Sequence, residues 1–89
     1  MAGTEGIAAR VVAIVAEQAL IPPAEVRLDA SLEMHGLDSL GLVEVIFGIE
    51  EAFDVSVPFN VNDPGASPFD TSSVRAVIAA VEALVAAKP

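Results

Sequence analysis

Apolar residues recur at helical spacing over three stretches of the chain, and turn-forming residues separate these stretches. The first stretch predicts a helix over roughly residues 4–20, because its apolar side chains return every three or four positions. We expect Thr4 to cap this helix, and Pro22-Pro23 prevents it from continuing. Arg10 and Glu17 fall on the polar side, and the apolar stripe consists of Ile7, Val11, Ile14 and Val15.

A long connection follows over residues 21–37, with apolar residues spaced along it. We expect Val26, Leu28 and Leu32 to pin this connection onto the helices. Pro23 is suited to beginning a short turn, because its ring fixes φ near the helical value. His35 is expected to be a surface or loop residue near the end of the connection.

The second helical stretch covers about residues 39–53, and its two faces differ in character. At about 100° per residue, the face that should enter the core contains Leu42, Val45, Ile46, Ile49 and Phe53. The opposite face carries Gly41, Glu44, Gly48 and Glu51, and Leu40 and Phe47 lie beside it. Apolar residues next to carboxylates suit a docking surface for a partner protein. For Phe47, packing against the connecting loops is an equally good interpretation.

The last helical stretch is expected over about residues 72–87, with Thr71 or Ser72 as its cap. Its apolar stripe consists of Val74, Val77, Ile78, Val81, Leu84 and Val85. Before it, residues 55–58 form an extended exit, and residues 59–70 are rich in turn formers, so we expect at most one irregular turn there. No stretch alternates well enough to predict a sheet.

The expected fold is therefore all-α. It is a small helical bundle of three principal helices plus a short irregular or single-turn third helix between the last two of them. The 89 residues are expected to form a single domain over residues 1–89. Because aromatic residues are only 4% of the chain, its core must consist mainly of Ala, Val, Leu and Ile.

Composition excludes several classes of function. The chain has no Cys, so it has no disulfide and no thiolate metal site, and its acids lack the spacing of an EF-hand loop. We therefore expect no resident metal. No secretion signal and no apolar run of membrane-spanning length is present, which predicts a cytoplasmic protein.

The net charge of −9 is unevenly distributed. Residues 28–74 contain nine acids and no Lys or Arg. Such a field repels nucleic acid and anionic lipid and attracts basic protein surfaces. The same acids would also serve as a solubilising surface.

Ser39 is the candidate for chemistry, because it stands where the second helix should begin. Free backbone N–H groups and the positive end of the helix dipole at such a position suit a phosphate ester. A Ser-His-Asp hydrolase using His35 is a poor alternative, since nothing fixes a third partner or an oxyanion hole and no Gly-x-Ser-x-Gly elbow is present. We therefore expect that the chain is not an enzyme and has no catalytic residue.

Three features carry a resemblance to a known family: Gly36-Leu37-Asp38-Ser39-Leu40, the following Val43-Glu44, and Glu50-Glu51-Ala52-Phe53-Asp54 with Pro58. With them, the chain resembles the acyl carrier proteins of fatty-acid and polyketide synthesis from about Ile7 to Leu84. The resemblance implies that Ser39 carries covalent 4′-phosphopantetheine. It also implies that Asp38 is the motif acid, which binds Mg²⁺ with the coenzyme A pyrophosphate when the arm is attached.

The resemblance also implies partners. These are a phosphopantetheinyl transferase, and acyl- or aminoacyl-loading ligases, acyltransferases or synthases with basic docking surfaces, all acting on a monomeric carrier. The docking residues are expected to be Leu40, Glu44, Phe47 and Glu51. Three alternatives stay open: a stand-alone peptidyl or aminoacyl carrier, an acidic interaction domain without an arm, and Ser39 as a plain helix cap.

Three departures from the family pattern predict a specialised carrier of a lipid or secondary-metabolite pathway. Gly41 stands where general carriers usually have an acid, and Phe47 where they usually have the more adaptable Met. Residues 59–70 replace the family's acidic short third helix. The residues do not identify the cargo.

Overall fold

The computed structural model describes residues 4–58 and 70–88. Its helices are α1 (Thr4–Ala19), α2 (Ser39–Phe53) and α3 (Val74–Ala86), and two 3-10 turns, η1 (Pro23–Glu25) and η2 (Glu33–His35), lie between α1 and α2. Within these two ranges no residue forms a strand. The all-α prediction is confirmed, and the helix over 39–53 has the bounds that the sequence predicts.

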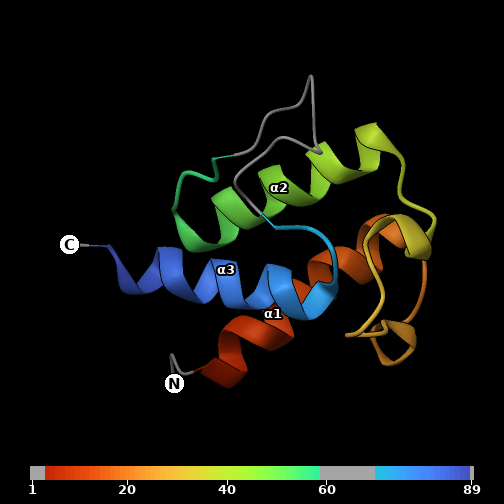
Figure 1. Ribbon diagram of the computed structural model, residues 1–89, viewed down its shortest axis with the longest axis horizontal. Helices are drawn as coiled ribbons and strands as arrows, with labels where there is room; N and C mark the ends of the chain where they lie inside the picture. The colour runs from red at the N-terminus through yellow and green to blue at the C-terminus, as the bar shows by residue number, and fades with distance from the viewer. Residues whose placement is uncertain (1–3, 59–69, 89) are drawn as a thin grey trace.

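The three helices pack around one apolar core. Figure 1 shows α2 and α3 running in the same direction and α1 running opposite to both, and α1 contacts each of them. As the composition predicts, the fully buried side chains are aliphatic. The core consists of Val11, Val15, Leu32, Leu37, Leu42, Val45, Ile46, Ile49, Val57, Val74, Val77 and Val81.

The close approach of α1 to α2 depends on a glycine that the helical pattern places on the outward face. Gly48 is half-buried, and a Cβ atom built on it would lie 3.1 Å from Cγ2 of Ile14. Gly48 therefore faces α1, which corrects the prediction that it lies on the solvent side with Glu44 and Glu51. The helical period locates a face, but only packing decides how much of that face a neighbouring helix covers.

Backbone hydrogen bonds join the connection between α1 and α2 to the start of α3. Leu32 is fully buried and Val26 is half-buried, as predicted, but the Leu28 side chain is 37% exposed. The prediction that this side chain anchors the connection is therefore wrong. Leu28 contributes its carbonyl oxygen instead, which accepts a hydrogen bond from the Arg75 N–H at 2.9 Å.

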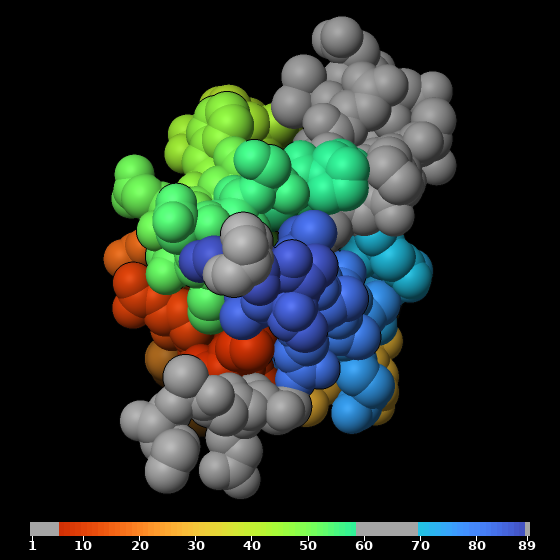
Figure 2. Space-filling view, turned by 90° about the vertical axis from the view of Figure 1, so that its left-hand side faces the viewer, coloured from red at the N-terminus to blue at the C-terminus, as the bar shows by residue number. Residues whose placement is uncertain are grey.

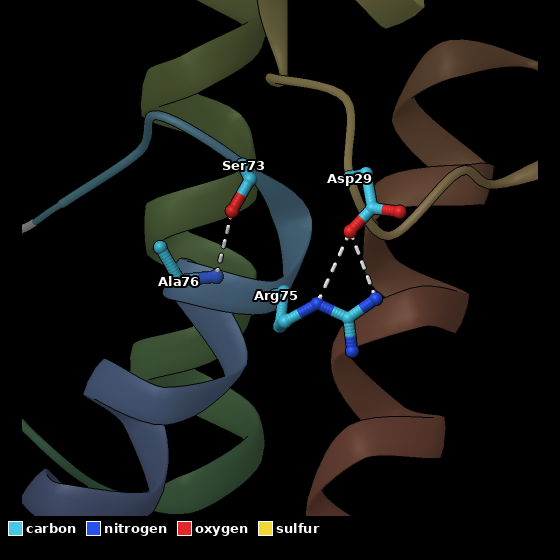
Figure 3. Close-up of polar contacts among 4 residues, drawn as sticks. All are labelled: Asp29, Ser73, Arg75 and Ala76. Carbon is cyan, nitrogen blue, oxygen red and sulfur yellow. Dashed lines mark hydrogen bonds and ion pairs between the residues drawn. The ribbon is translucent and has the colours of Figure 1, made fainter.

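The amino end of α3 has a partner for each of its first three N–H groups. The Val74 N–H donates to Ala30 O at 2.9 Å, the Arg75 N–H donates to Leu28 O, and the Ala76 N–H donates to Oγ of Ser73 at 3.0 Å. Figure 3 shows the Ser73 cap. The prediction of Thr71 or Ser72 as the cap is wrong, because the bonds to the connection fix the helix start at Val74.

At the opposite end of the bundle, contacts join the residues that follow α3 to the end of α2. Figure 2 views this end, where the carboxyl ends of α2 (green) and α3 (blue) lie near the first half of α1 (red). Nζ of Lys88 donates to Phe53 O at 2.8 Å and lies 3.9 Å from Oδ2 of Asp54. The short irregular helix expected within residues 59–70 falls almost wholly outside the described residues, as does the capping side chain of Thr4.

Candidate functional site

Ser39 is the first residue of α2, but it is not the residue that caps it. Asp38 is the N-cap, and its Oδ1 accepts the Gly41 N–H at 2.9 Å, while its carbonyl oxygen accepts the Leu42 N–H at 2.9 Å. The interpretation of Ser39 as a plain helix cap is therefore wrong. The Ser39 side chain is exposed, and it forms no hydrogen bond within the part of the chain that the structure describes.

Two backbone donors remain beside the Ser39 hydroxyl. Among the described residues, neither the Ser39 N–H nor the Leu40 N–H has a hydrogen-bond partner, as expected for the first turn of a helix. These groups and the positive end of the α2 dipole favour an anionic group at this position. The arrangement therefore fits a phosphate ester on Ser39.

Gly41 allows Asp38 and Leu37 to approach the first turn of α2. A Cβ atom built on Gly41 would lie 3.0 Å from Cδ2 of Leu37, whose side chain is buried. A side chain at position 41 would thus press on the core residue next to the cap. This contact gives a structural reason for glycine at a position where helix propensity alone disfavours it.

The turn η2 leads into Ser39 and ends in a tightly bonded reversal. Gly36 has φ 85°, the left-handed conformation that glycine adopts most easily. The Gly36 N–H donates to Glu33 O at 2.9 Å, and the Leu37 N–H donates to Leu32 O at 3.4 Å. Because Leu32 and Leu37 are both buried, this reversal sets where Asp38 and Ser39 begin the helix.

His35 braces the same segment through both ring nitrogens. Nε2 lies 2.9 Å from the Arg27 nitrogen, and Nδ1 lies 2.8 Å from the Ser31 carbonyl oxygen. Since a backbone N–H can only donate, Nε2 is the acceptor, and the ring proton is on Nδ1. With both nitrogens bonded to the backbone, His35 is not placed to activate Ser39, which disfavours a hydrolase.

The exposed face of α2 carries the four residues expected to dock partners. Leu40 is 68% exposed and Phe47 is 57% exposed, and Glu44 and Glu51 are also exposed. Of the two interpretations of Phe47, the exposed one agrees with the structure. Spacings of four, three and four residues place these side chains on one stripe that begins next to Ser39.

Acids next to this stripe have structural partners, whereas the structure shows no such partner for the stripe acids among the residues that it describes. Oε2 of Glu50 accepts the Val57 N–H at 2.8 Å, and Asp54 ends α2 in the left-handed conformation beside Lys88. Within residues 4–58 and 70–88, Glu44 and Glu51 form no ion pair. Their charges are therefore available to a basic partner.

Other charged groups form contacts on the surface of the scaffold, away from Ser39. Nε and Nη2 of Arg75 both donate to Oδ1 of Asp29, at 3.2 and 2.8 Å (Figure 3). Hydrogen bonds from Ser72 lower the pKa of the Asp70 carboxyl. Over the described part of the chain, no group of three or more His, Cys, Asp or Glu residues could hold a metal ion, and no helix is long and apolar enough to cross a membrane.

Sequence patterns did not reveal that Met34 is exposed beside the site or that His35 bonds to the backbone of the connection. Met34 lies in η2, five residues before Ser39, and its side chain is 75% exposed. Neither η2 nor its brace has a helical or alternating period, so periodicity gives no signal for them. The bond from Arg27 to His35 spans eight residues, and only the folded chain shows it.

The chain is similar to known proteins along most of its length. The family described as the phosphopantetheine attachment site matches residues 9–81. A curated acyl carrier protein from Prochlorococcus marinus (strain MIT 9515) is 40% identical over 55 residues, which cover 61% of this chain and 69% of the relative. No solved structure matches the chain significantly.

Proposed function

Because the chain belongs to the phosphopantetheine-attachment family that includes the acyl carrier proteins, we propose that Ser39 is the residue that carries its arm. The carrying observation is the exposed hydroxyl at the first residue of α2, beside the Ser39 and Leu40 N–H groups, which have no hydrogen-bond partner among the described residues. The protein is a carrier and not an enzyme, since the chemistry belongs to the arm and to the partner enzymes.

The arm supplies a terminal thiol that holds an acyl cargo as a thioester. The contribution of this chain is the Oγ of Ser39, which loses its proton and forms the new ester bond to the phosphorus next to the pantetheine of coenzyme A. The pyrophosphate bond of coenzyme A breaks in the same step, and the nucleotide half leaves with its phosphate as adenosine 3′,5′-bisphosphate. The N–H groups of Ser39 and Leu40 and the α2 dipole stabilise the phosphate charge. The Asp38 carboxylate, which uses Oδ1 to cap α2, would supply the charge that holds Mg²⁺ during attachment.

Mass spectrometry of the intact protein tests the attachment site. After incubation with coenzyme A, Mg²⁺ and a phosphopantetheinyl transferase, we expect the wild type to gain one phosphopantetheine and Ser39→Ala to gain none. Ser56→Ala, at another exposed serine, should be modified like the wild type. Ser39→Ala should keep the wild-type unfolding midpoint, because Asp38 is the cap. Modification of the Ser39→Ala protein would refute the assignment.

We also propose that the α2 stripe of Leu40, Glu44, Phe47 and Glu51 docks the partner enzymes. Exposed apolar side chains supply burial, and the exposed acids steer a basic surface toward Ser39. Glu44→Lys should weaken binding of the transferase and of loading enzymes, and added salt should weaken wild-type binding. Glu17→Lys makes the same charge change on α1 and is the control. Equal effects of the two substitutions would exclude this dock.

For the cargo, we propose an acyl group in preference to an aminoacyl or peptidyl group, because the similar curated protein is an acyl carrier protein. The partners would then be acyl-loading ligases, acyltransferases and synthases. We propose the cytoplasm as the compartment, since attachment of the arm consumes coenzyme A. Intact mass of the loaded protein from its own cells identifies the cargo, and an aminoacyl mass would contradict the acyl assignment.

We further propose a specialised carrier and not the housekeeping carrier of fatty-acid elongation. Gly41 supports this proposal, because a larger side chain there would crowd Leu37, and so does the exposed Phe47. The third departure, residues 59–70, lies almost wholly outside the described residues. Full activity with malonyl loading and chain elongation enzymes of its own cell would refute specialisation.

A further inference from the structure

The turn before Ser39 holds a large apolar side chain in solvent. Met34 is 75% exposed, although hydrogen bonds hold the backbone around it. Leu32 is fully buried, the Met34 N–H donates to Oγ of Ser31 at 3.1 Å, and His35 joins Arg27 to Ser31. Hydrogen bonds therefore hold the backbone of the turn that carries Met34.

Met34 and Leu40 place apolar surface on both sides of Ser39 in the chain. Between them lie the glycine reversal at Gly36, the buried Leu37 and the cap Asp38. Figure 1 shows that η2 leads directly into the amino end of α2. The docking stripe on α2 accounts for the Leu40 side only.

An enzyme that acts on Ser39 through an interface of standard size also reaches the Met34 side. A standard interface buries about 800 Å² on each partner, a patch about 16 Å in radius. Five residues of fully extended chain span at most about 18 Å, and η2 with its reversal is more compact than an extended chain. A patch of this size centred on Ser39 thus includes Met34.

The charges around Met34 determine the kind of surface that covers it. Residues 28–74 contain no Lys or Arg, and Glu33 and Asp38 are exposed on either side of Met34 in the chain. A complementary partner has a basic rim around an apolar contact. The flexible thioether of Met adapts to such a contact without a preformed pocket.

On the basis of the proposed attachment at Ser39, we propose that Met34 is a docking residue for the phosphopantetheinyl transferase. In this proposal His35 is a positioning residue that holds η2 so that Met34 meets the enzyme. The Met34 side chain extends the docking stripe of α2 across Ser39 onto the connection. The His35 ring does not touch the enzyme and acts through the placement of Met34.

Steady-state kinetics with apo-protein, coenzyme A, Mg²⁺ and a phosphopantetheinyl transferase test this proposal. Met34→Ala should raise KM for the apo-protein by about three- to tenfold, with kcat and the unfolding midpoint unchanged. Leu20→Ala is the matched control, because Leu20 is 91% exposed at the end of α1, and it should leave KM unchanged. An unchanged KM for Met34→Ala, or an equal increase for Leu20→Ala, would overturn the role of Met34.

A double-mutant cycle tests the role of His35 at a temperature where every variant is folded. His35→Ala should raise KM with kcat unchanged, and the double variant with Met34→Ala should be little worse than the worse single variant. Additive increases in KM, or a loss confined to the unfolding midpoint, would mean that His35 does not act through Met34. If the wild-type protein gains no arm, the proposed function itself is overturned. If the wild type is modified normally and the Met34 and His35 substitutions leave KM unchanged, this inference alone is overturned.

Discussion

Asp38 has a structural role and a proposed chemical role, and two substitutions separate them. Oδ1 of Asp38 accepts the Gly41 N–H at 2.9 Å and so caps α2. Its negative charge is also the group proposed to hold Mg²⁺ when Ser39 is modified. Asp38→Ala removes the acceptor and the charge, whereas Asp38→Asn keeps an acceptor of the same shape and removes only the charge.

The expected size of each effect follows from these contacts. Loss of an N-cap acceptor typically costs about 1 kcal/mol, which lowers the unfolding midpoint of a domain of this size by about 4–8 °C. Asn caps a helix nearly as well as Asp, so Asp38→Asn should lose only the attraction of the carboxylate to the helix dipole, about 0.3–1 kcal/mol. Because Asp38 is exposed, we expect the lower end of that range.

Two assays measure the two roles on the same proteins. Thermal unfolding followed by circular dichroism should rank the wild type first, Asp38→Asn close behind and Asp38→Ala lowest. Mass spectrometry of arm attachment with saturating coenzyme A should show both variants at least about tenfold slower than the wild type. Asp38→Asn modified at the wild-type rate would refute the need for the charge. Asp38→Ala with the wild-type midpoint would refute the cap.

Three further predictions concern the scaffold. Ser73→Ala should lower the unfolding midpoint by about 4–8 °C through loss of the α3 cap, and Ser72→Ala should lower it by less than half as much; equal shifts would contradict the assignment of the cap. Gly36→Ala should cost about 1–2 kcal/mol in urea unfolding, although nothing lies within 4 Å of the added Cβ, and an unchanged midpoint would exclude backbone strain there. Hydrogen bonds from Ser72 lower the pKa of Asp70 in the folded state. The ionised Asp70 carboxylate therefore stabilises the fold at neutral pH, and this stabilisation is lost as the pH falls through the lowered pKa. The difference in midpoint between the wild type and Asp70→Ala should therefore vanish in acid, and a difference that persists there would contradict the reasoning.

The helices and the start of α2 could be predicted from the sequence because their signals are local. The apolar period over residues 39–53 indicates both the length of α2 and its buried face, and the observed bounds agree. Ser39 was found in the same way, since the motif and the helix start coincide at one residue. The position of Leu40 and Phe47 beside the acidic face follows from the helical period, but the exposure of Phe47 was left open by the sequence and decided by the structure.

Contacts between distant segments decided the remaining features. Thr71, Ser72 and Ser73 are three adjacent residues that can each cap a helix, and no local signal chooses between them. The choice of Ser73 depends on carbonyl groups more than forty residues earlier, at Leu28 and Ala30, which accept the first N–H groups of α3.

The same distinction applies to the site. Sequence predicted a serine at a helix start, but the brace from His35 and the exposed Met34 follow from how the connection folds back on itself. Hydrogen bonds and burial of this kind depend on which segments meet in space, and a periodic pattern along the chain does not contain that information. The sequence by itself thus determined the helices and the position of Ser39, and the tertiary structure decided which groups surround it.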